Sequence, residues 1–155
     1  MQRRTFLQAV ALAGAMPMKA FAKSDVPTID VYKSETCGCC AQWVDHLRKH
    51  GFDVKTQNVP NTAAYRARFG IPQAMGSCHT ATIGGYALEG HVPAAEIRRL
   101  LREKPRAIGL AVPGMPMGSP GMEQAGMPAD AYDVLLIRKN GSHVIYRHYA
   151  GQKAN

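Results

Sequence analysis

The sequence predicts an α/β domain in which strands and helices follow one another in the order β-α-β-α-β-β-α, with a loop and a hairpin after them. Three observations carry this prediction. Apolar residues recur alternately at strand spacing and at helical spacing along the chain. The length of 155 residues suits one domain and is too short for two of ordinary size. Hydrophobic residues make up 46% and charged residues 19% of the chain, which excludes wholesale disorder.

The first unit is a strand, a turn and a helix. Residues 28–33 alternate and are rich in β-formers, which predicts a strand. Residues 41–49 carry apolar side chains at helical spacing and are closed by Gly51, so they predict a helix. Residues 52–56 predict a second strand, and such a β-α-β unit normally places its two strands in one sheet.

The remaining elements follow at regular intervals. Residues 62–69 predict a short helix, 81–88 a hairpin around a Gly-Gly turn, and 93–104 a helix with one apolar face. Residues 132–146 predict a final hairpin, because they contain an Asn-Gly turn between two apolar runs. The order up to the third helix is that of a thioredoxin-like domain, in which a Cys-x-x-Cys motif follows the first strand.

A loop rich in methionine, proline and glycine spans residues 109–128. Methionine usually fills gaps in a core, but a core role predicts helical or strand spacing, which this segment lacks. Thioether sulfur suits monovalent copper. We therefore predict Met115 and Met117 as metal ligands, with core filling as the alternative.

The amino terminus predicts an export signal. Arg3-Arg4 is followed by Phe6-Leu7, by an apolar stretch and by Ala20-Phe21-Ala22, which is the three-part layout of such a signal. The paired arginines indicate the twin-arginine type, whose cargo is periplasmic. We expect a signal at residues 1–22 and a mature domain at 23–155, with no membrane span in the mature form, because the apolar run is shorter than the roughly 20 residues a span needs. An amphipathic helix packed on the domain is the alternative for the amino terminus.

The formal charge of +8 does not predict a nucleic-acid partner. Without residues 1–22 the chain has 16 basic and 11 acidic side chains, a formal charge of +5, scattered along the sequence. A basic stripe with interleaved aromatic residues is missing from the pattern, so we expect no nucleic acid to bind.

The four cysteines, Cys37, Cys39, Cys40 and Cys78, are the main chemical signal. Two disulfides are one interpretation in an oxidising compartment. The spacing favours a reactive or metal-binding cluster, because neighbouring cysteines do not easily bond to each other and three crowded thiols hold loops together poorly. A helix that starts at the turn would stabilise a thiolate on Cys37 and point Cys40 inward. Cys39 has no role in a simple dithiol mechanism and indicates a multi-thiolate site for a soft metal, with zinc as the competitor.

Two histidines are candidate ligands beside these cysteines. His91 lies at the start of a predicted helix and would supply an imidazole to the cysteine turn. His79 adjoins Cys78, although strand alternation would send the two side chains to opposite faces.

Four motifs in order resemble the CopG-type periplasmic copper-resistance family, long catalogued as a domain of unknown function. They are Cys37-Gly-Cys-Cys40 followed by Trp43, then Gly76-Ser-Cys-His-Thr80, Tyr86-Ala-Leu-Glu-Gly-His-Val-Pro93, and the loop from Gly109 to Glu123. The resemblance covers residues 28–149. It implies a thioredoxin-like fold that holds several copper ions through its cysteines, with histidine and methionine support, and a role in copper tolerance or copper redox chemistry.

Both approaches lead to one expected function. We expect an exported protein that holds several Cu(I) ions through clustered thiolates, in sequestration or in Cu(I)/Cu(II) cycling, because soft ligands prefer the monovalent ion. Its partners would be copper ions and other periplasmic copper-handling proteins. Two alternatives stay open: a thiol-disulfide oxidoreductase that uses Cys37 and Cys40, and a passive structural zinc domain.

Overall fold

The structure, a computed structural model, describes residues 26–152. The predicted export signal, residues 1–22, lies outside the described residues. Within the described range, the helices are too short or too polar to cross a membrane.

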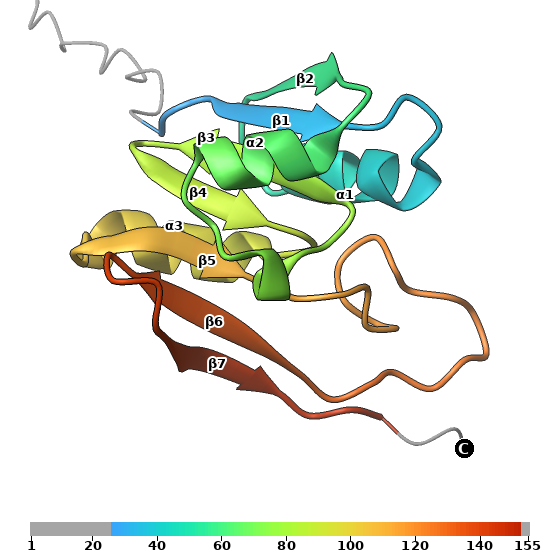
Figure 1. The fold of residues 1–155 in the computed structure, drawn as a ribbon. Helices are drawn as coiled ribbons and strands as arrows, with labels where there is room; N and C mark the ends of the chain where they lie inside the picture. The colour runs from blue at the N-terminus through green and yellow to red at the C-terminus, as the bar shows by residue number, and fades with distance from the viewer. Residues whose placement is uncertain (1–25, 153–155) are drawn as a thin grey trace, which may run out of the picture.

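The fold is a mixed α/β domain built on one sheet (Figure 1). The sheet has seven strands in the order β2-β1-β3-β4-β5-β6-β7, in which β1 pairs in parallel with β2 and β4 with β5, and the other neighbours are antiparallel. The elements are β1 (Ile29–Lys33), α1 (Gly38–Lys49), β2 (Val54–Asn58), α2 (Thr62–Arg68), the 3₁₀ helix η1 (Gln73–Met75), β3 (His79–Ile83), β4 (Tyr86–Glu89), α3 (Ala94–Glu103), β5 (Ala107–Ala111), β6 (Tyr132–Arg138) and β7 (His143–Tyr149).

The predicted elements are all present, and β5 is an element that the sequence pattern does not reveal. This strand lies between β4 and β6 and is mostly buried, so it shows no polar-apolar alternation. Gly109 belongs to this strand rather than to the methionine-rich loop, because it pairs with Ala87 of β4. The pairing requires glycine, since a Cβ at this position would overlap the carbonyl oxygen of Ala87. The loop predicted at 109–128 therefore starts after Ala111.

The sheet is covered by helices on both faces. In Figure 1, α2 and η1 lie in front of the sheet, and α1 and α3 lie behind it. Trp43 and Leu47 of α1 and Ile97 and Leu100 of α3 are fully buried in one core with the strands. Apolar side chains at helical spacing explain why α1 packs there, and the indole N–H of Trp43 donates to the carbonyl of Val92, 2.9 Å away.

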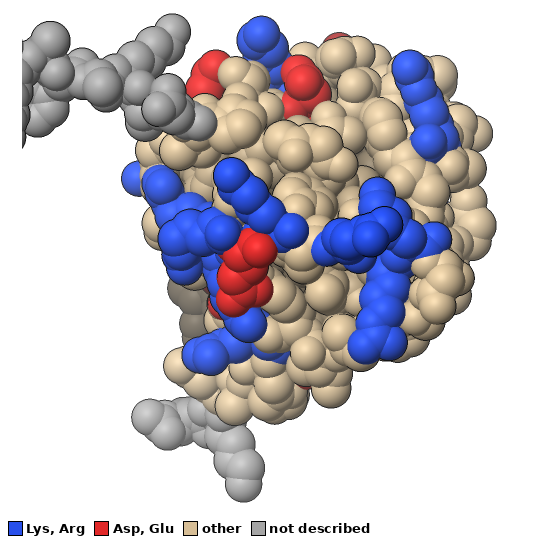
Figure 2. Space-filling view, turned by 90° about the vertical axis from the view of Figure 1, so that its left-hand side faces the viewer, with Lys and Arg blue, Asp and Glu red and all other residues tan. Residues whose placement is uncertain are grey.

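The cysteine turn and the methionine-rich loop lie on the same side of the molecule. Figure 1 shows the turn between β1 and α1 and the loop between β5 and β6 together at one end, opposite the point where the described chain begins. Figure 2 shows the opposite end, where Lys and Arg form separate groups divided by uncharged surface. The fold therefore collects the sulfur-bearing segments at one end of the sheet.

Candidate metal centre

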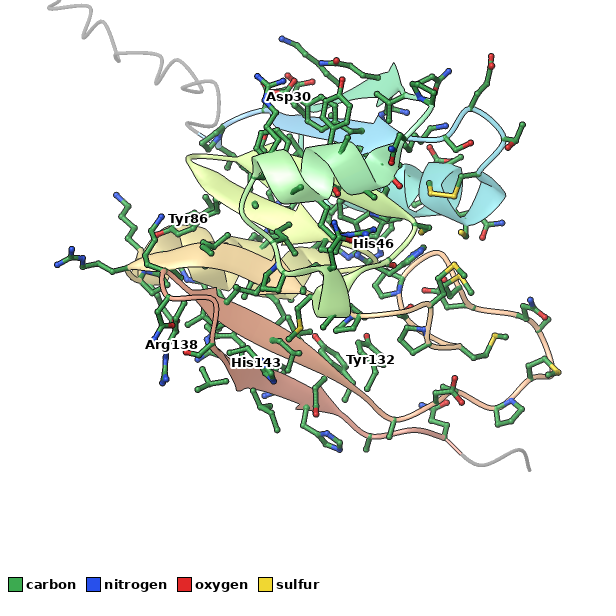
Figure 3. All side chains as sticks on the ribbon, viewed as in Figure 1. Asp30, His46, Tyr86, Tyr132, Arg138 and His143 are labelled. Atoms are coloured by element: carbon green, nitrogen blue, oxygen red, sulfur yellow. A yellow bond between two sulfur atoms is a disulfide. The ribbon has the colours of Figure 1, made fainter. Side chains whose placement is uncertain are left out.

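The start of α1 places three cysteines in one turn. The helix begins at Gly38, earlier than the sequence predicts, and Cys37 is its N-cap residue. Cys40 is fully buried, as predicted, whereas Cys37 and Cys39 are partly exposed. A disulfide joins Cys37 to Cys40, and Figure 3 shows it as a yellow bond at the start of α1.

Cys78, from the opposite segment, completes a cluster of four sulfur atoms. It lies directly before β3 and is partly exposed. The Sγ atom of Cys39 lies 3.5 Å from that of Cys37 and 3.9 Å from that of Cys78. All four Sγ atoms lie within 4.8 Å of one another. The extra cysteine of the motif thus connects the Cys37–Cys40 pair to Cys78.

The structure holds one disulfide, not the two that an even number of cysteines suggests. Cys39 and Cys78 are free thiols. The bond joins two cysteines of the cluster that are three residues apart, so it does not close a long loop. A four-thiolate site would form here only after this disulfide is reduced.

His91 points one ring nitrogen at Cys78 and is held by the other. Its Nδ1–H donates to the carbonyl of Pro120, 2.8 Å away, so the lone pair of the neutral ring is on Nε2. That Nε2 lies 3.1 Å from the Sγ atom of Cys78. The ring is fully buried, and burial lowers the pKa of His91. A hydrogen bond from the second nitrogen is the usual way in which a ligating histidine is oriented.

His79 also faces Cys78, against the expectation from strand alternation. Its Nδ1 lies 3.3 Å from the Sγ atom of Cys78, and its ring packs against Trp43 at 4.3 Å between centroids. Alternation does not apply, because β3 begins at His79 and Cys78 lies outside the strand. Within residues 26–152 the buried Nε2 of His79 has no hydrogen-bond partner. Both predicted histidines therefore join Cys78 in a second group of potential ligands.

The burial of His79 predicts that the apoprotein loses stability in acid. Burial lowers the pKa of His79 from 6.5 to about 3, so below pH 6.5 the unfolded chain binds a proton that the folded chain does not. The free energy of unfolding should therefore fall by about 1 kcal/mol per pH unit below pH 6 on account of this residue. Urea unfolding of the metal-free protein between pH 7 and pH 4.5 measures this slope. His79→Gln should flatten it, whereas replacement of the exposed His143 should not; equal slopes in all three proteins would contradict the prediction.

A buried ion pair fixes the backbone before Cys78. The Nε of Arg66 lies 2.7 Å from Oε1 of Glu89, and both side chains are buried. The same Glu89 oxygen accepts the backbone N–H of Ser77 at 2.7 Å, and its second oxygen accepts the hydroxyl of Thr80 at 2.6 Å. Arg66 also donates to the carbonyl of Ser77 at 2.8 Å. Arg66 and Glu89 therefore hold both sides of the segment that carries Cys78, a role that the sequence analysis missed.

The only sequence signal for this network was a charged residue at an inward position of a buried strand. Glu89 ends β4, whose last three residues are all buried. The partner on α2 gave no signal at all, because Arg66 lies among other polar residues of a surface helix.

The methionine-rich loop closes over the cluster through its backbone. Pro120 accepts the hydrogen bond from His91, and the next residue, Gly121, has a φ of +85°. A Cβ on Gly121 would lie 2.6 Å from the backbone nitrogen of Trp43, so only glycine allows the loop to approach α1 this closely. Near the start of the loop, the carbonyl oxygen of Gly114 accepts a hydrogen bond from the hydroxyl of Ser77.

The two predicted methionine ligands lie in different places. Met115 follows Gly114, next to Ser77, and its side chain is 54% exposed. Met117 lines a separate surface hollow, whose lining includes none of the four cysteines, His79 or His91. The structure brings the cysteines and histidines together, whereas Met117 lines this separate hollow.

Comparison with known proteins identifies the family. Two solved structures named "Copper resistance protein copG", Form 2 and Form 1, are each 45% identical in sequence to this chain, with a TM-score of 0.75 for each. The alignments cover 79% and 81% of this chain and 98% and 99% of the two solved chains. The chain belongs to the CopG family of copper resistance proteins.

CopG membership confirms the resemblance of the four motifs. A family model described as "Protein of unknown function, DUF411" matches residues 75–122, which include Cys78, His91 and the first part of the loop. None of the curated proteins matches the chain. Within this CopG protein, the cysteine cluster is the group of side chains best suited to bind copper.

Proposed function

We propose that this protein is exported to the periplasm and holds several Cu(I) ions through Cys37, Cys39, Cys40 and Cys78, and that it contributes to copper resistance. Sequestration and Cu(I)/Cu(II) cycling are the two ways in which it would do so. His79 and His91 would supply imidazole ligands and Met115 a thioether. The solved relatives named as copper resistance proteins support copper as the cargo.

The observation that carries the proposal is the position of Cys78. Its sulfur belongs both to the group of four cysteines and to the group with His79 and His91. A thiolate has several lone pairs and can bridge two metal ions, so Cys78 would connect a sulfur-only side with a side that also offers imidazole. Soft thiolates select Cu(I), and imidazole also suits Cu(II). The arrangement therefore accommodates both oxidation states of copper.

Copper binding would displace protons from the cluster. Burial, together with the neighbouring Cys39, raises the pKa of the Cys78 thiol to about 12, so this thiol is protonated in the metal-free protein. A metal that binds its thiolate must release that proton, and the affinity should fall as the pH falls.

The disulfide connects copper chemistry to thiol chemistry. Reduction of Cys37–Cys40 consumes two electrons and two protons and yields two thiols. In the reverse reaction, oxidation of the two thiols to the disulfide releases two electrons and two protons, and reduction of two Cu(II) ions to Cu(I) takes up those two electrons. In both roles, the reductant that opens the disulfide would be a dithiol of the compartment or of a partner protein.

The export route and the partners belong to the same proposal. The twin-arginine layout of residues 1–22 supports export of the folded chain. A thioredoxin-like core is supported by the parallel β1–β2 pair, the antiparallel β3–β4 hairpin and the disulfide at the start of α1. Other periplasmic copper-handling proteins would deliver or accept the metal.

A metal titration tests the proposal. We expect the reduced chain, handled without oxygen, to bind more than one Cu(I) per molecule in competition with a chelator, as counted by elemental analysis. Zinc is titrated in parallel, because four cysteines also form a closed tetrahedral zinc site. His91→Ala, which removes a proposed ligand, should weaken copper binding. His50→Ala, which removes an exposed histidine outside the cluster, is the control and should not. One zinc per chain, or copper bound no more tightly than by an ordinary dithiol, would overturn the proposal.

The disulfide itself favours a second candidate function, thiol-disulfide exchange by Cys37 and Cys40. Cys39→Ser separates the two functions, because a dithiol mechanism does not need this residue. If copper binding is the function, the copper stoichiometry falls and no insulin reduction is seen in either protein. If exchange is the function, insulin reduction survives the substitution.

A further inference from the structure

The methionines of the loop do not fill the core. Met75, in η1, is 8% exposed and packs in an apolar cluster with Ile71. In contrast, Met115 and Met127 are 54% and 56% exposed, and Met117 is partly exposed. A core-filling role requires burial, so packing does not explain these side chains.

Two of these methionines line one hollow. Met117 and Met127 come from opposite limbs of the loop and line a surface hollow of about 300 Å³. One wall is formed by Tyr132 and Tyr149, whose rings stack with centroids 4.9 Å apart. Tyr132, labelled in Figure 3, lies at the loop end of β6. The lining of the hollow therefore combines stacked aromatic rings, two methionine side chains and the acidic residues Glu123 and Asp130.

The backbone holds the two limbs at a fixed separation. The N–H of Met117 donates to Oδ2 of Asp130 at 2.9 Å, and the N–H of Asp130 donates to the carbonyl of Met117 at 2.9 Å. Gly118 has a φ of +83°, and a Cβ there would collide with the side chain of Ala129. The N–H of Met127 donates to the carbonyl of Gln124 at 3.1 Å. These bonds preform the hollow, so that a ligand would not have to order the loop.

We infer that Met117 and Met127 form a second site, which takes up a soft monovalent cation through two thioethers and passes it to the cysteine cluster. The inference rests on the proposed function for the identity of the cargo, which would be Cu(I). Neutral thioethers prefer Cu(I) or Ag(I) to zinc. The two sites are close along the chain, because Pro120, three residues after Met117, is hydrogen-bonded to His91. The transfer is a ligand exchange in which the ion keeps its oxidation state and the thiols of the cluster release protons.

Silver titration of a thiol-free variant tests the site separately from the cluster. Cys39→Ser with Cys78→Ser leaves only the Cys37–Cys40 disulfide, so that the oxidised protein has no thiol to bind metal. With ¹³C-labelled methionine methyl groups, Ag(I) should shift the Met117 and Met127 signals together, equally at pH 7 and pH 5, because thioethers bind no proton in this range. Met75 serves as the internal reference.

Substitutions by leucine remove the sulfur and keep the apolar side chain. Met117→Leu should weaken the Ag(I) affinity that the Met127 signal reports by about tenfold or more. Met115→Leu, outside the hollow, should leave this affinity unchanged. Independent shifts of the two signals, or an equal response to Zn(II), would overturn the site. If the proposed copper cluster fails, this result is unaffected, because the variant contains no cluster.

The transfer step is measured in the reduced protein with all four cysteines. Met117→Leu with Met127→Leu should slow the loading of Cu(I) from a chelator several-fold, whereas the amount of copper that the four cysteines hold at equilibrium should stay the same. Loading at the wild-type rate would overturn the transfer role.

Discussion

Cys78→Ser is expected to remove most of the copper that the reduced protein binds. The substitution deletes the one sulfur that belongs to both groups of potential ligands and leaves His79 and His91 without a thiolate partner. Loss of second-shell partners already weakens metal sites about 10–100-fold, so loss of this bridging ligand should weaken Cu(I) binding at least about 100-fold. Competition with a chelator gives the affinity, and elemental analysis gives the copper content.

Ser77→Ala is the matched control for this substitution. It removes a neighbouring hydroxyl, which donates to the carbonyl of Gly114 and lies 3.9 Å from the Cys78 sulfur, and it keeps all four sulfur atoms. Copper content should therefore stay at the wild-type value in this variant. Thermal unfolding of both metal-free variants shows whether either substitution disturbs the fold. If Cys78→Ser folds and binds copper as the wild type does, Cys78 is no ligand and the proposed cluster is wrong.

Local sequence patterns predicted the helices and most of the strands, whereas the features that they missed depend on tertiary contacts. Helical spacing located α1 and α3 because their apolar faces repeat along the sequence. The same logic missed β5, since a strand buried on both faces has no alternation to detect. It also misjudged His79, because the alternation that separates neighbours applies only inside a strand, and β3 begins at that residue.

The candidate site was predicted as far as residue type alone permits. Four cysteines and two histidines have a chemistry that is visible in any fold, and a helix that starts at the cysteine turn brings them into reach. The Cys37–Cys40 disulfide is the pair that the oxidoreductase alternative named, whereas the preferred multi-thiolate interpretation did not predict it. The sequence could not separate the environments of Met115 and Met117, which depend on how the loop folds back at Asp130.

Arg66→Ala is expected to destabilise the protein by about 3–5 kcal/mol, because it leaves the carboxylate of Glu89 buried without its counter-charge. Two further bonds are lost with the side chain, to the carbonyl of Ser77 and to the side chain of Gln73. Urea unfolding at pH 7 measures the change in the free energy of unfolding. Arg102→Ala, which removes an exposed arginine of α3, is the matched control and should have little effect.

A double substitution distinguishes a packing role of Arg66 from a role in positioning Cys78. Arg66→Met with Glu89→Gln removes both buried charges but keeps an acceptor for the N–H of Ser77, so it should recover at least half of the lost stability. It cannot restore the bond from Arg66 to the Ser77 carbonyl. If that bond positions the Cys78 sulfur, Cu(I) affinity stays below the wild-type value even where stability returns. If stability and Cu(I) affinity both recover in the double variant, Arg66 acts in folding alone. If Arg66→Ala lowers the free energy of unfolding by less than about 1 kcal/mol, the buried pair does not hold this end of the sheet.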